Sequence, residues 1–121
     1  MTYTDLPTLH CNREQLIQVF ENLIGNAIKY RHPARAPHIE INANREGSWW
    51  RFSVKDNGRG FSMEYAKTIF DLFKRLHGQQ IPGSGIGLAL CDRIIEQHGG
   101  RIWAESEPDI GSTFHFTIST A

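Results

Sequence analysis

The chain has 121 residues, a length typical of one domain, and 40% of them are hydrophobic and 21% charged. Thirteen basic and thirteen acidic residues give a net charge of zero, which argues against a dedicated nucleic-acid binder, and the composition excludes disordered and collagen-like chains. No apolar run is long enough to cross a membrane and no secretory signal is visible, so we expect the two distant cysteines, Cys11 and Cys91, to be free thiols in a reducing cytosol.

The first predicted elements are a short strand near residues 8–10 and a helix that Asn12 caps and that ends near Tyr30. Apolar residues recur along this helix at helical spacing. They are Leu16, Ile17, Phe20, Leu23, Ile24, Ala27 and Ile28. Pro33 disfavours helix in the residues just before it. We therefore expect a helix with one broad buried face.

The rest of the chain changes between strand and helix patterns. The predicted elements are strands over residues 39–43 and 50–54 joined by a turn at Gly47, a glycine-rich turn over 56–61, short helical pieces within 62–83, a helix from about Ser84 to His98, and strands over 101–106 and 112–118. Helices and strands are partly segregated, which predicts an α+β fold: a two-layer sandwich whose mixed sheet has about five strands, with helices on one face.

Three polar residues lie along one line of the first helix. Asn22, Asn26 and Lys29 are spaced by four residues and then three, so they share one face. An amide oxygen suits a hard cation such as Mg²⁺, and a lysine suits a phosphate. The alternative is an ordinary solvated helix face.

An acidic residue ends the second predicted strand. Asp56 has the same strand parity as Phe52 and Val54, so its carboxylate should point toward the apolar side, where it needs a partner. A purine amino group is a fitting donor, and Gly58 and Gly60 allow the backbone to turn tightly beside a ligand. The alternative is a turn in which the aspartate binds its own backbone.

Two further segments favour the same kind of ligand. A glycine-rich run over residues 83–88 opens the second long helix, where exposed backbone N–H groups and the helix dipole suit a phosphate. No strand immediately precedes this run, so it does not fit a dinucleotide-binding unit. Ser112 shares parity with Phe114, which places its hydroxyl on the same side as Asp56, although an ordinary strand start explains it equally.

In this order, the segments resemble the catalytic ATP-binding domain of sensor histidine kinases, within the gyrase, Hsp90, histidine kinase and MutL ATPase superfamily. The resemblance extends from about Leu6 to Ile118. The matching segments are QVFENLIGNAIKYR, DNGRGF, IFDLFKRLHG, GSGIGLALC and GSTFHF. Five motifs in the family's order make a chance match improbable, and the resemblance implies the same two-layer ATP-binding fold.

The resemblance implies a site for Mg²⁺ and phosphate on the first helix. Asn26 would bind Mg²⁺, Asn22 would lie in or next to its coordination shell, and Lys29 would contact phosphate. The glycine-rich run would give further phosphate contacts. Its residues are Gly83, Ser84, Gly85, Ile86, Gly87 and Leu88.

The resemblance also implies an adenine pocket. Asp56 would accept a hydrogen bond from the adenine amino group, and Ser112 would support it. The other residues expected at the base are Tyr30, Gly58, Gly60 and Phe61.

Residues 62–83 resemble the lid of this family. Phe70 and Phe73 would anchor the lid. When it closes, Lys74 or Arg75 would reach the phosphates.

One position bears on the reaction. ATPases of this superfamily carry a glutamate four residues before the Mg²⁺ asparagine, but here that residue is Asn22, and Glu21 is turned away by roughly 100° on a helix. An amide cannot take the proton of water. The resemblance therefore implies that the domain binds Mg-ATP, hydrolyses it poorly and transfers the γ-phosphate to a histidine of another domain.

None of the six histidines is followed by an acidic residue, as the acceptor of this family usually is. We therefore expect residues 1–121 to be one domain cut from a longer cytoplasmic sensor kinase, unable to phosphorylate itself alone. Its expected partners are its own dimerisation and phosphoacceptor domain and a response regulator, without nucleic-acid or membrane contact. The alternatives are a stand-alone ATPase or chaperone-like protein, an inactive nucleotide-binding module, and an anti-sigma-type serine kinase.

Overall fold

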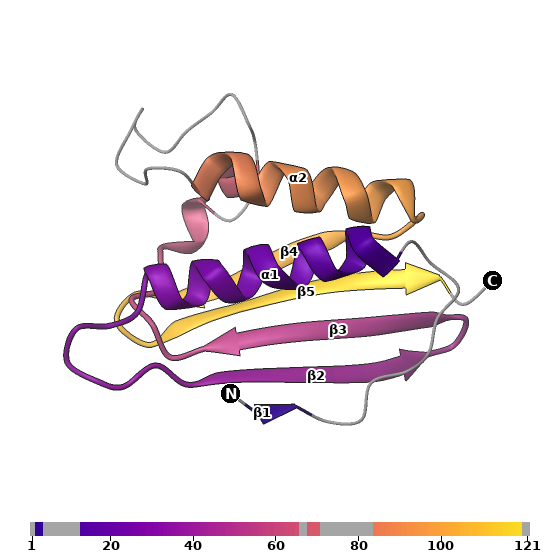
Figure 1. The fold of residues 1–121 in the computed structure, drawn as a ribbon. Helices are drawn as coiled ribbons and strands as arrows, with labels where there is room; N and C mark the ends of the chain where they lie inside the picture. Colours follow the sequence, from indigo (N-terminus) through magenta and orange to yellow (C-terminus); the bar gives the residue numbers. More distant parts are fainter. Residues whose placement is uncertain (1, 4–12, 66–67, 71–83, 120–121) are drawn as a thin grey trace.

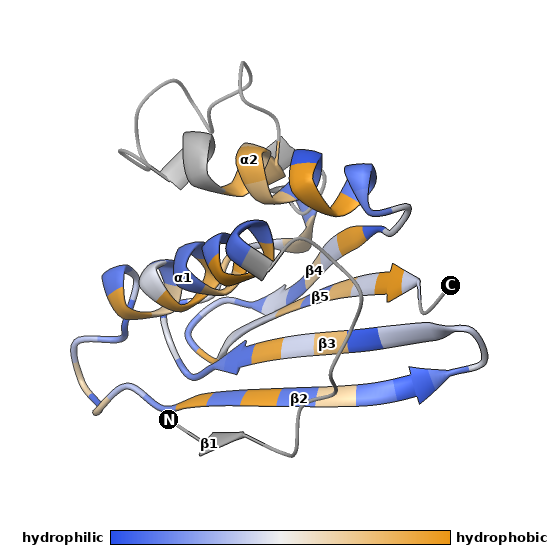
Figure 2. Ribbon diagram, turned by 45° about the vertical axis from the view of Figure 1, so that its right-hand side comes forward, coloured by the Kyte–Doolittle hydropathy of each residue, from blue (hydrophilic) through white to orange (hydrophobic). Residues whose placement is uncertain are grey.

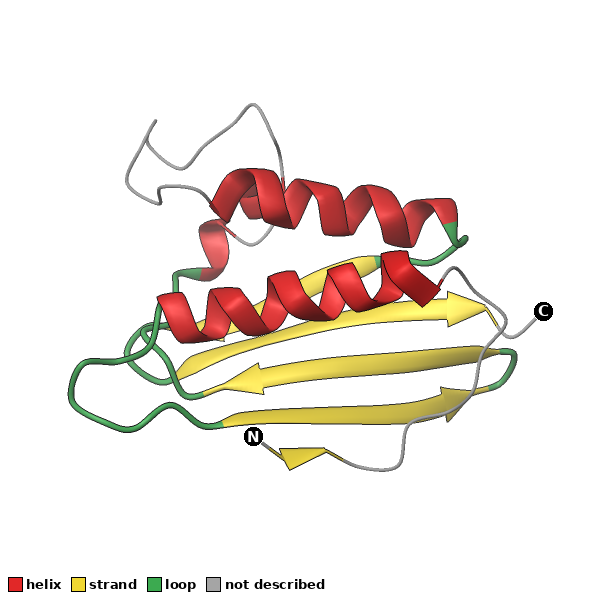
Figure 3. Cartoon of the chain, in the orientation of Figure 1, coloured by secondary structure: helices red, strands yellow, loops and turns green. Residues whose placement is uncertain are grey.

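Both long helices lie on one face of a five-stranded sheet (Figure 1, Figure 3). The computed structural model describes residues 2–3, 13–65, 68–70 and 84–119. The elements are β1 (Thr2–Tyr3), α1 (Arg13–Lys29), β2 (Ile39–Glu46), β3 (Trp49–Asp56), the short 3-10 helices η1 (Met63–Tyr65) and η2 (Thr68–Phe70), α2 (Ser84–Gln97), β4 (Ile102–Glu107) and β5 (Gly111–Ser119). This arrangement confirms the predicted two-layer α+β sandwich.

The sheet has the strand order β1-β2-β3-β5-β4. β1 pairs with β2 in parallel and the other neighbours are antiparallel, so the sheet is mixed, as predicted. β1 was not predicted, because two residues are too few to show a period. The strand predicted near residues 8–10 lies outside the described residues.

The core fills the space between the sheet and the helices. Phe20 of α1 packs edge-on against Phe52 and Phe116, whose rings stack at 5.1 Å between centroids. Figure 2 shows the apolar side of α1 turned toward the sheet. The broad apolar face predicted for this helix is wrong at its margins, because Ile17 and Ile28 are each 47% exposed: the sheet and α2 cover only part of the helix circumference.

One end of the sandwich collects the segments that were predicted to bind a ligand. The two long helices run antiparallel, so the end of α1 and the start of α2 lie at the same end as the end of β3 and the start of β5 (Figure 1). The β2–β3 turn at Gly47 lies at the opposite end. None of the described helices is both long and apolar enough to cross a membrane.

Candidate functional site

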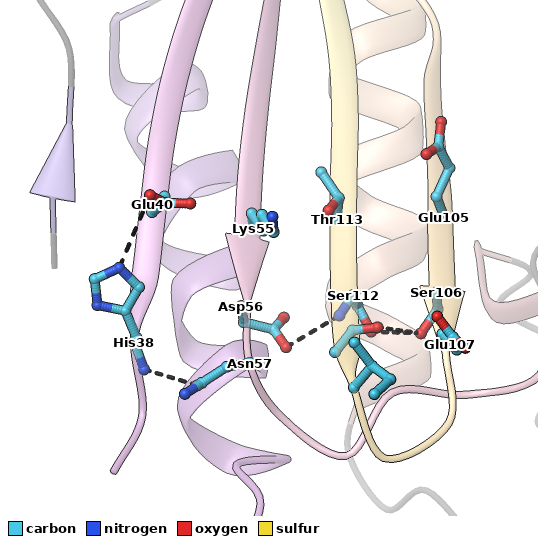
Figure 4. A pocket seen from close by; sticks show the side chains of 12 residues that line it. His38, Glu40, Lys55, Asp56, Asn57, Glu105, Ser106, Glu107, Ser112 and Thr113 are labelled. Carbon is cyan, nitrogen blue, oxygen red and sulfur yellow. Dashed lines mark hydrogen bonds and ion pairs between the residues drawn. The ribbon is translucent and has the colours of Figure 1, made fainter. Parts of the chain in front are cut away.

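Asp56 is the last residue of β3, and the described part of the chain hydrogen-bonds only one of its two carboxylate oxygens. Its Oδ1 accepts a hydrogen bond from the backbone N–H of Gly58 at 2.9 Å. It accepts a second from the backbone N–H of Ser112 at 3.3 Å, which Figure 4 shows. The contact with Gly58 is the turn interaction that was the alternative reading of this residue. Among the described residues, no donor reaches Oδ2, so one acceptor remains for a ligand.

Burial and hydrogen bonding oppose each other at this carboxylate. Partial burial raises the pKa of Asp56 above 3.8, and the backbone hydrogen bonds from Gly58 and Ser112 lower it to a smaller extent. A carboxylate that is costly to ionise in the folded chain is typical of a binding site, where a ligand supplies the missing donor.

The raised pKa predicts how the stability effect of Asp56→Asn depends on pH. Above 3.8 the folded chain holds this proton more tightly than the unfolded chain, so the contribution of Asp56 to the free energy of unfolding falls as pH rises through its folded pKa. Asparagine does not ionise, so the variant does not lose this stability as pH rises. We expect it to gain stability relative to the wild type as pH rises above about 4, measured by urea denaturation of both proteins. A difference that does not change with pH would contradict the assignment.

The hydroxyl of Ser106, a residue that was not predicted to belong to the site, links the segments around Asp56 by hydrogen bonds. Ser106 of β4 accepts from the backbone N–H of Phe61 at 2.8 Å and lies 2.7 Å from the Ser112 hydroxyl, and its own hydroxyl donates to the Gly111 carbonyl at 3.0 Å. Ser112 thus meets Asp56 through its backbone amide, whereas its hydroxyl was expected there. Serine is common at surfaces, so no pattern in the sequence marked Ser106.

Of the polar residues Asn22, Asn26 and Lys29 on α1, Asn22 contacts the second helix, α2. Asn22 and Asn26 are partly buried, whereas Lys29 and the neighbouring Glu21 are exposed. Burial raises the pKa of the Cys91 thiol on α2 to about 12, and a hydrogen bond from the Asn22 side chain counteracts this shift. The Asn22 amide therefore lies between α1 and α2, and the exposed Glu21 does not take its place.

Tyr30 joins the end of α1 to the turn after Asp56. Its carbonyl accepts from the backbone N–H of Arg59 at 2.9 Å, and a Cβ on Gly58 would lie 2.7 Å from that carbonyl oxygen. Among the described residues, no hydrogen-bond partner reaches the buried Tyr30 hydroxyl, and the Lys29 ammonium lies 5.6 Å from the centre of its ring. An unpartnered buried hydroxyl is costly unless a ligand or water satisfies it.

Other predicted site residues are only partly described. The Phe61 and Phe70 rings pack against Phe114, at 6.3 Å and 6.0 Å between centroids. Residues 84–88 form the first turns of α2, at the same end of the fold as Asp56. Phe73, Lys74, Arg75 and Gly83 lie outside the described residues.

A cavity of about 380 Å³ lies at this end of the sheet. Besides Asp56 and Ser112 it is lined by residues that alternate with core residues along the strands, including Glu40, Lys55, Glu105 and Thr113 (Figure 4). These side chains lie on the face away from α1 and α2. The predicted nucleotide site is on the helix side, so we do not assign this cavity to it.

The donor set fits Mg²⁺ held together with a phosphate ligand. Among the described residues, no three histidine, cysteine or acidic side chains group closely enough to hold a metal by themselves. Mg²⁺ in nucleotide sites takes only one or two protein oxygens and completes its shell with water and phosphate. The partly buried Asn26 can supply one such oxygen.

Comparison with known proteins agrees with this geometry. The family model "Histidine kinase-, DNA gyrase B-, and HSP90-like ATPase" matches residues 11–121. The chain is 49% identical over 119 residues to cyanobacterial phytochrome A of Nostoc sp. and 43% identical over 115 residues to the adaptive-response sensory kinase SasA of Synechococcus elongatus. These matches cover 98% and 94% of this chain but only 15% and 30% of those proteins.

Solved structures give the same result. The catalytic domain of histidine kinase ThkA superposes with a TM-score of 0.80 and 31% identity, over 98% of this chain and 76% of that domain. Full-length ShkA, solved in complex with AMPPNP, superposes with a TM-score of 0.81 and 29% identity, over 99% of this chain and 25% of ShkA. The chain therefore belongs to the histidine kinase-, DNA gyrase B- and HSP90-like ATPase family, and its fold is that of a histidine kinase catalytic domain.

Proposed function

We propose that this chain binds Mg-ATP and presents its γ-phosphate to a histidine on a separate dimerisation and phosphoacceptor domain. The observation that carries the proposal is the Asp56 carboxylate, which has one oxygen fixed by two backbone amides and the other without a partner among the described residues. That free oxygen suits the adenine amino group. ShkA, a neighbour in fold, was solved with AMPPNP, which has an adenine base.

In this proposal, some site residues contact the adenine base and others hold Mg²⁺ and the phosphates. Tyr30, Gly58, Gly60 and Phe61 border the base near Asp56. Asn26, with Asn22 beside it, would hold Mg²⁺, which neutralises phosphate charge and orients the γ-phosphate when bound. The N-terminus of α2 would give backbone donors to the phosphates.

The proposed transfer leaves the nucleophile to a partner. A ring nitrogen of the acceptor histidine attacks the γ-phosphorus, the bond to the bridging oxygen breaks, ADP leaves with that electron pair, and the imidazole loses its proton to solvent. Asn22 cannot act as a base for water and Glu21 is exposed, so hydrolysis by the chain alone should be slow. The phosphohistidine would then serve a response regulator, and the whole would work in the cytoplasm, where ATP is available.

The experiment that tests the function has two parts. Mg-ATP is titrated calorimetrically into the 121-residue chain, and labelled ATP is then incubated with this chain and the phosphoacceptor segment of the same kinase, expressed separately. Binding followed by an acid-labile phosphohistidine on that segment would support the proposal. Steady phosphate release by the chain alone would instead favour a stand-alone ATPase, and no binding would favour an inactive module.

The metal role of Asn26 gives a further prediction. We expect Asn26→Ala to lower the affinity for ATP roughly tenfold when Mg²⁺ is present, about 1.4 kcal/mol, and to change it little when EDTA is present. Asn44→Ala, at an exposed position of β2, is the control and should bind ATP like the wild type. An equal loss with and without Mg²⁺ would count against a metal ligand.

A further inference from the structure

A single guanidinium bridges the two turns that carry the site. Arg35 lies in the segment between α1 and β2, and its Nε donates to the carbonyl of Asn57 at 2.7 Å. Its Nη2 donates to the carbonyls of Gly58 at 3.1 Å and of Ile110 at 3.2 Å, and also to the carbonyl of Asp109. One exposed side chain therefore contacts four backbone carbonyls from two distant parts of the chain.

Those four carbonyls flank the residues that define the carboxylate site. Residues 57–58 directly follow Asp56, and residues 109–110 lie just before Ser112, whose amide donates to the Asp56 carboxylate. The two turns touch, because a Cβ on Gly111 would lie 2.1 Å from the Asp56 carbonyl oxygen. Asp56 and Ser112 are the last pair of the ladder between β3 and β5, so the two turns are the first backbone beyond this pair.

The segment that carries Arg35 is itself fastened to the same two turns. The Asn57 side chain accepts from the backbone N–H of His38 at 2.8 Å and donates to the Ala36 carbonyl at 3.0 Å. On the other side of Arg35, the His32 ring lies 3.4 Å from the Asp109 carboxylate. The guanidinium is thus presented from a backbone that is held on both sides.

The chemistry of these contacts requires a guanidinium. Its five N–H donors lie in one rigid plane and can serve several carbonyls together, whereas the ammonium of a lysine is a compact donor on a flexible stem. We propose that Arg35 is a positioning residue for the nucleotide site: it holds the turns 57–60 and 107–111 at the spacing where the Ser112 amide reaches the Asp56 carboxylate. The role in nucleotide binding rests on the function proposed above.

The first test needs no nucleotide. Amide hydrogen exchange at Ser112 and Gly58 is followed by NMR in the 121-residue wild type and in Arg35→Gln. We expect exchange at the Ser112 amide to become at least about tenfold faster, because local opening of the two turns becomes easier. The control is Arg45→Gln, since Arg45 is also exposed and donates to one carbonyl, that of Gly47, at the opposite end of the sheet. Unchanged exchange in Arg35→Gln would overturn the proposal.

The second test measures binding and includes a chemical rescue. Arg35→Gln and Arg35→Lys should each bind ATP roughly tenfold more weakly than the wild type. Guanidinium ion at tens of millimolar should recover part of the affinity of Arg35→Ala, whereas sodium chloride at equal ionic strength should not. A full-affinity lysine variant, or faster exchange with unchanged ATP affinity, would overturn a positioning role. If the wild type itself binds no ATP, the proposed function fails, and the exchange experiment still decides whether Arg35 holds the turns.

Discussion

Asp56→Asn is expected to lower the affinity for Mg-ATP about 100-fold, because hydrogen bonds to charged groups contribute about 1.5–3 kcal/mol. The new amide oxygen can keep the hydrogen bonds from the Gly58 and Ser112 amides. Its NH₂ group would replace the free oxygen and meet the adenine amino group donor to donor. The chain should stay folded, since it loses a carboxylate that is costly to ionise. Calorimetric titration of ATP into both proteins measures the change.

The matched control for this variant is Glu96→Gln. Glu96 is exposed in the last turn of α2, away from the start of that helix and from Asp56. This variant also removes one negative charge, so it should bind ATP nearly as the wild type does. Wild-type affinity in Asp56→Asn would remove Asp56 from the adenine pocket.

Gly60→Ala should lower the free energy of unfolding by at least about 2 kcal/mol, because it combines backbone strain with a close contact. Gly60 has a φ of 65°, where a side chain is disfavoured, and a Cβ there would lie 2.1 Å from the Glu107 carbonyl oxygen and 3.1 Å from that of Gly111. These carbonyls belong to the turn between β4 and β5 and cannot move without disturbing the site. Urea denaturation measures the loss.

Gly47→Ala separates the two causes. Gly47 has nearly the same φ, 64°, but a Cβ there would meet nothing within 4 Å. It therefore carries only the strain of the left-handed conformation, about 1 kcal/mol. If both variants lose the same free energy, the contact between Gly60 and the β4–β5 turn contributes nothing.

The strands show what alternation along the sequence can and cannot predict. It located the hairpin of β2 and β3, but it ended the first strand at residue 43, whereas β2 extends to Glu46. The last residues, Asn44 to Glu46, are all polar and exposed, so they carry no period of two. They are strand because their backbone pairs with residues 49–51.

Shared parity predicted that Asp56 and Ser112 lie close together, and the two residues are paired between β3 and β5. Parity could not show that the backbone amide of Ser112, and not its hydroxyl, would meet the Asp56 carboxylate. Arg35 and Ser106 gave no signal, because they act on carbonyls and amides that lie as far as 75 and 45 residues away along the chain. Almost any residue can supply a main-chain carbonyl or amide, so contacts of this kind cannot be predicted from residue types.

The pairing of β3 with β5 has a consequence for folding kinetics. Asp56 and Ser112 are 56 residues apart along the chain, so the carboxylate site forms only when β3 pairs with β5. Closing this long loop costs entropy, and that cost is met before the site exists. An adenine nucleotide would then recognise the finished sheet and not its precursors. Saturating ligand should slow unfolding and leave the refolding rate nearly unchanged.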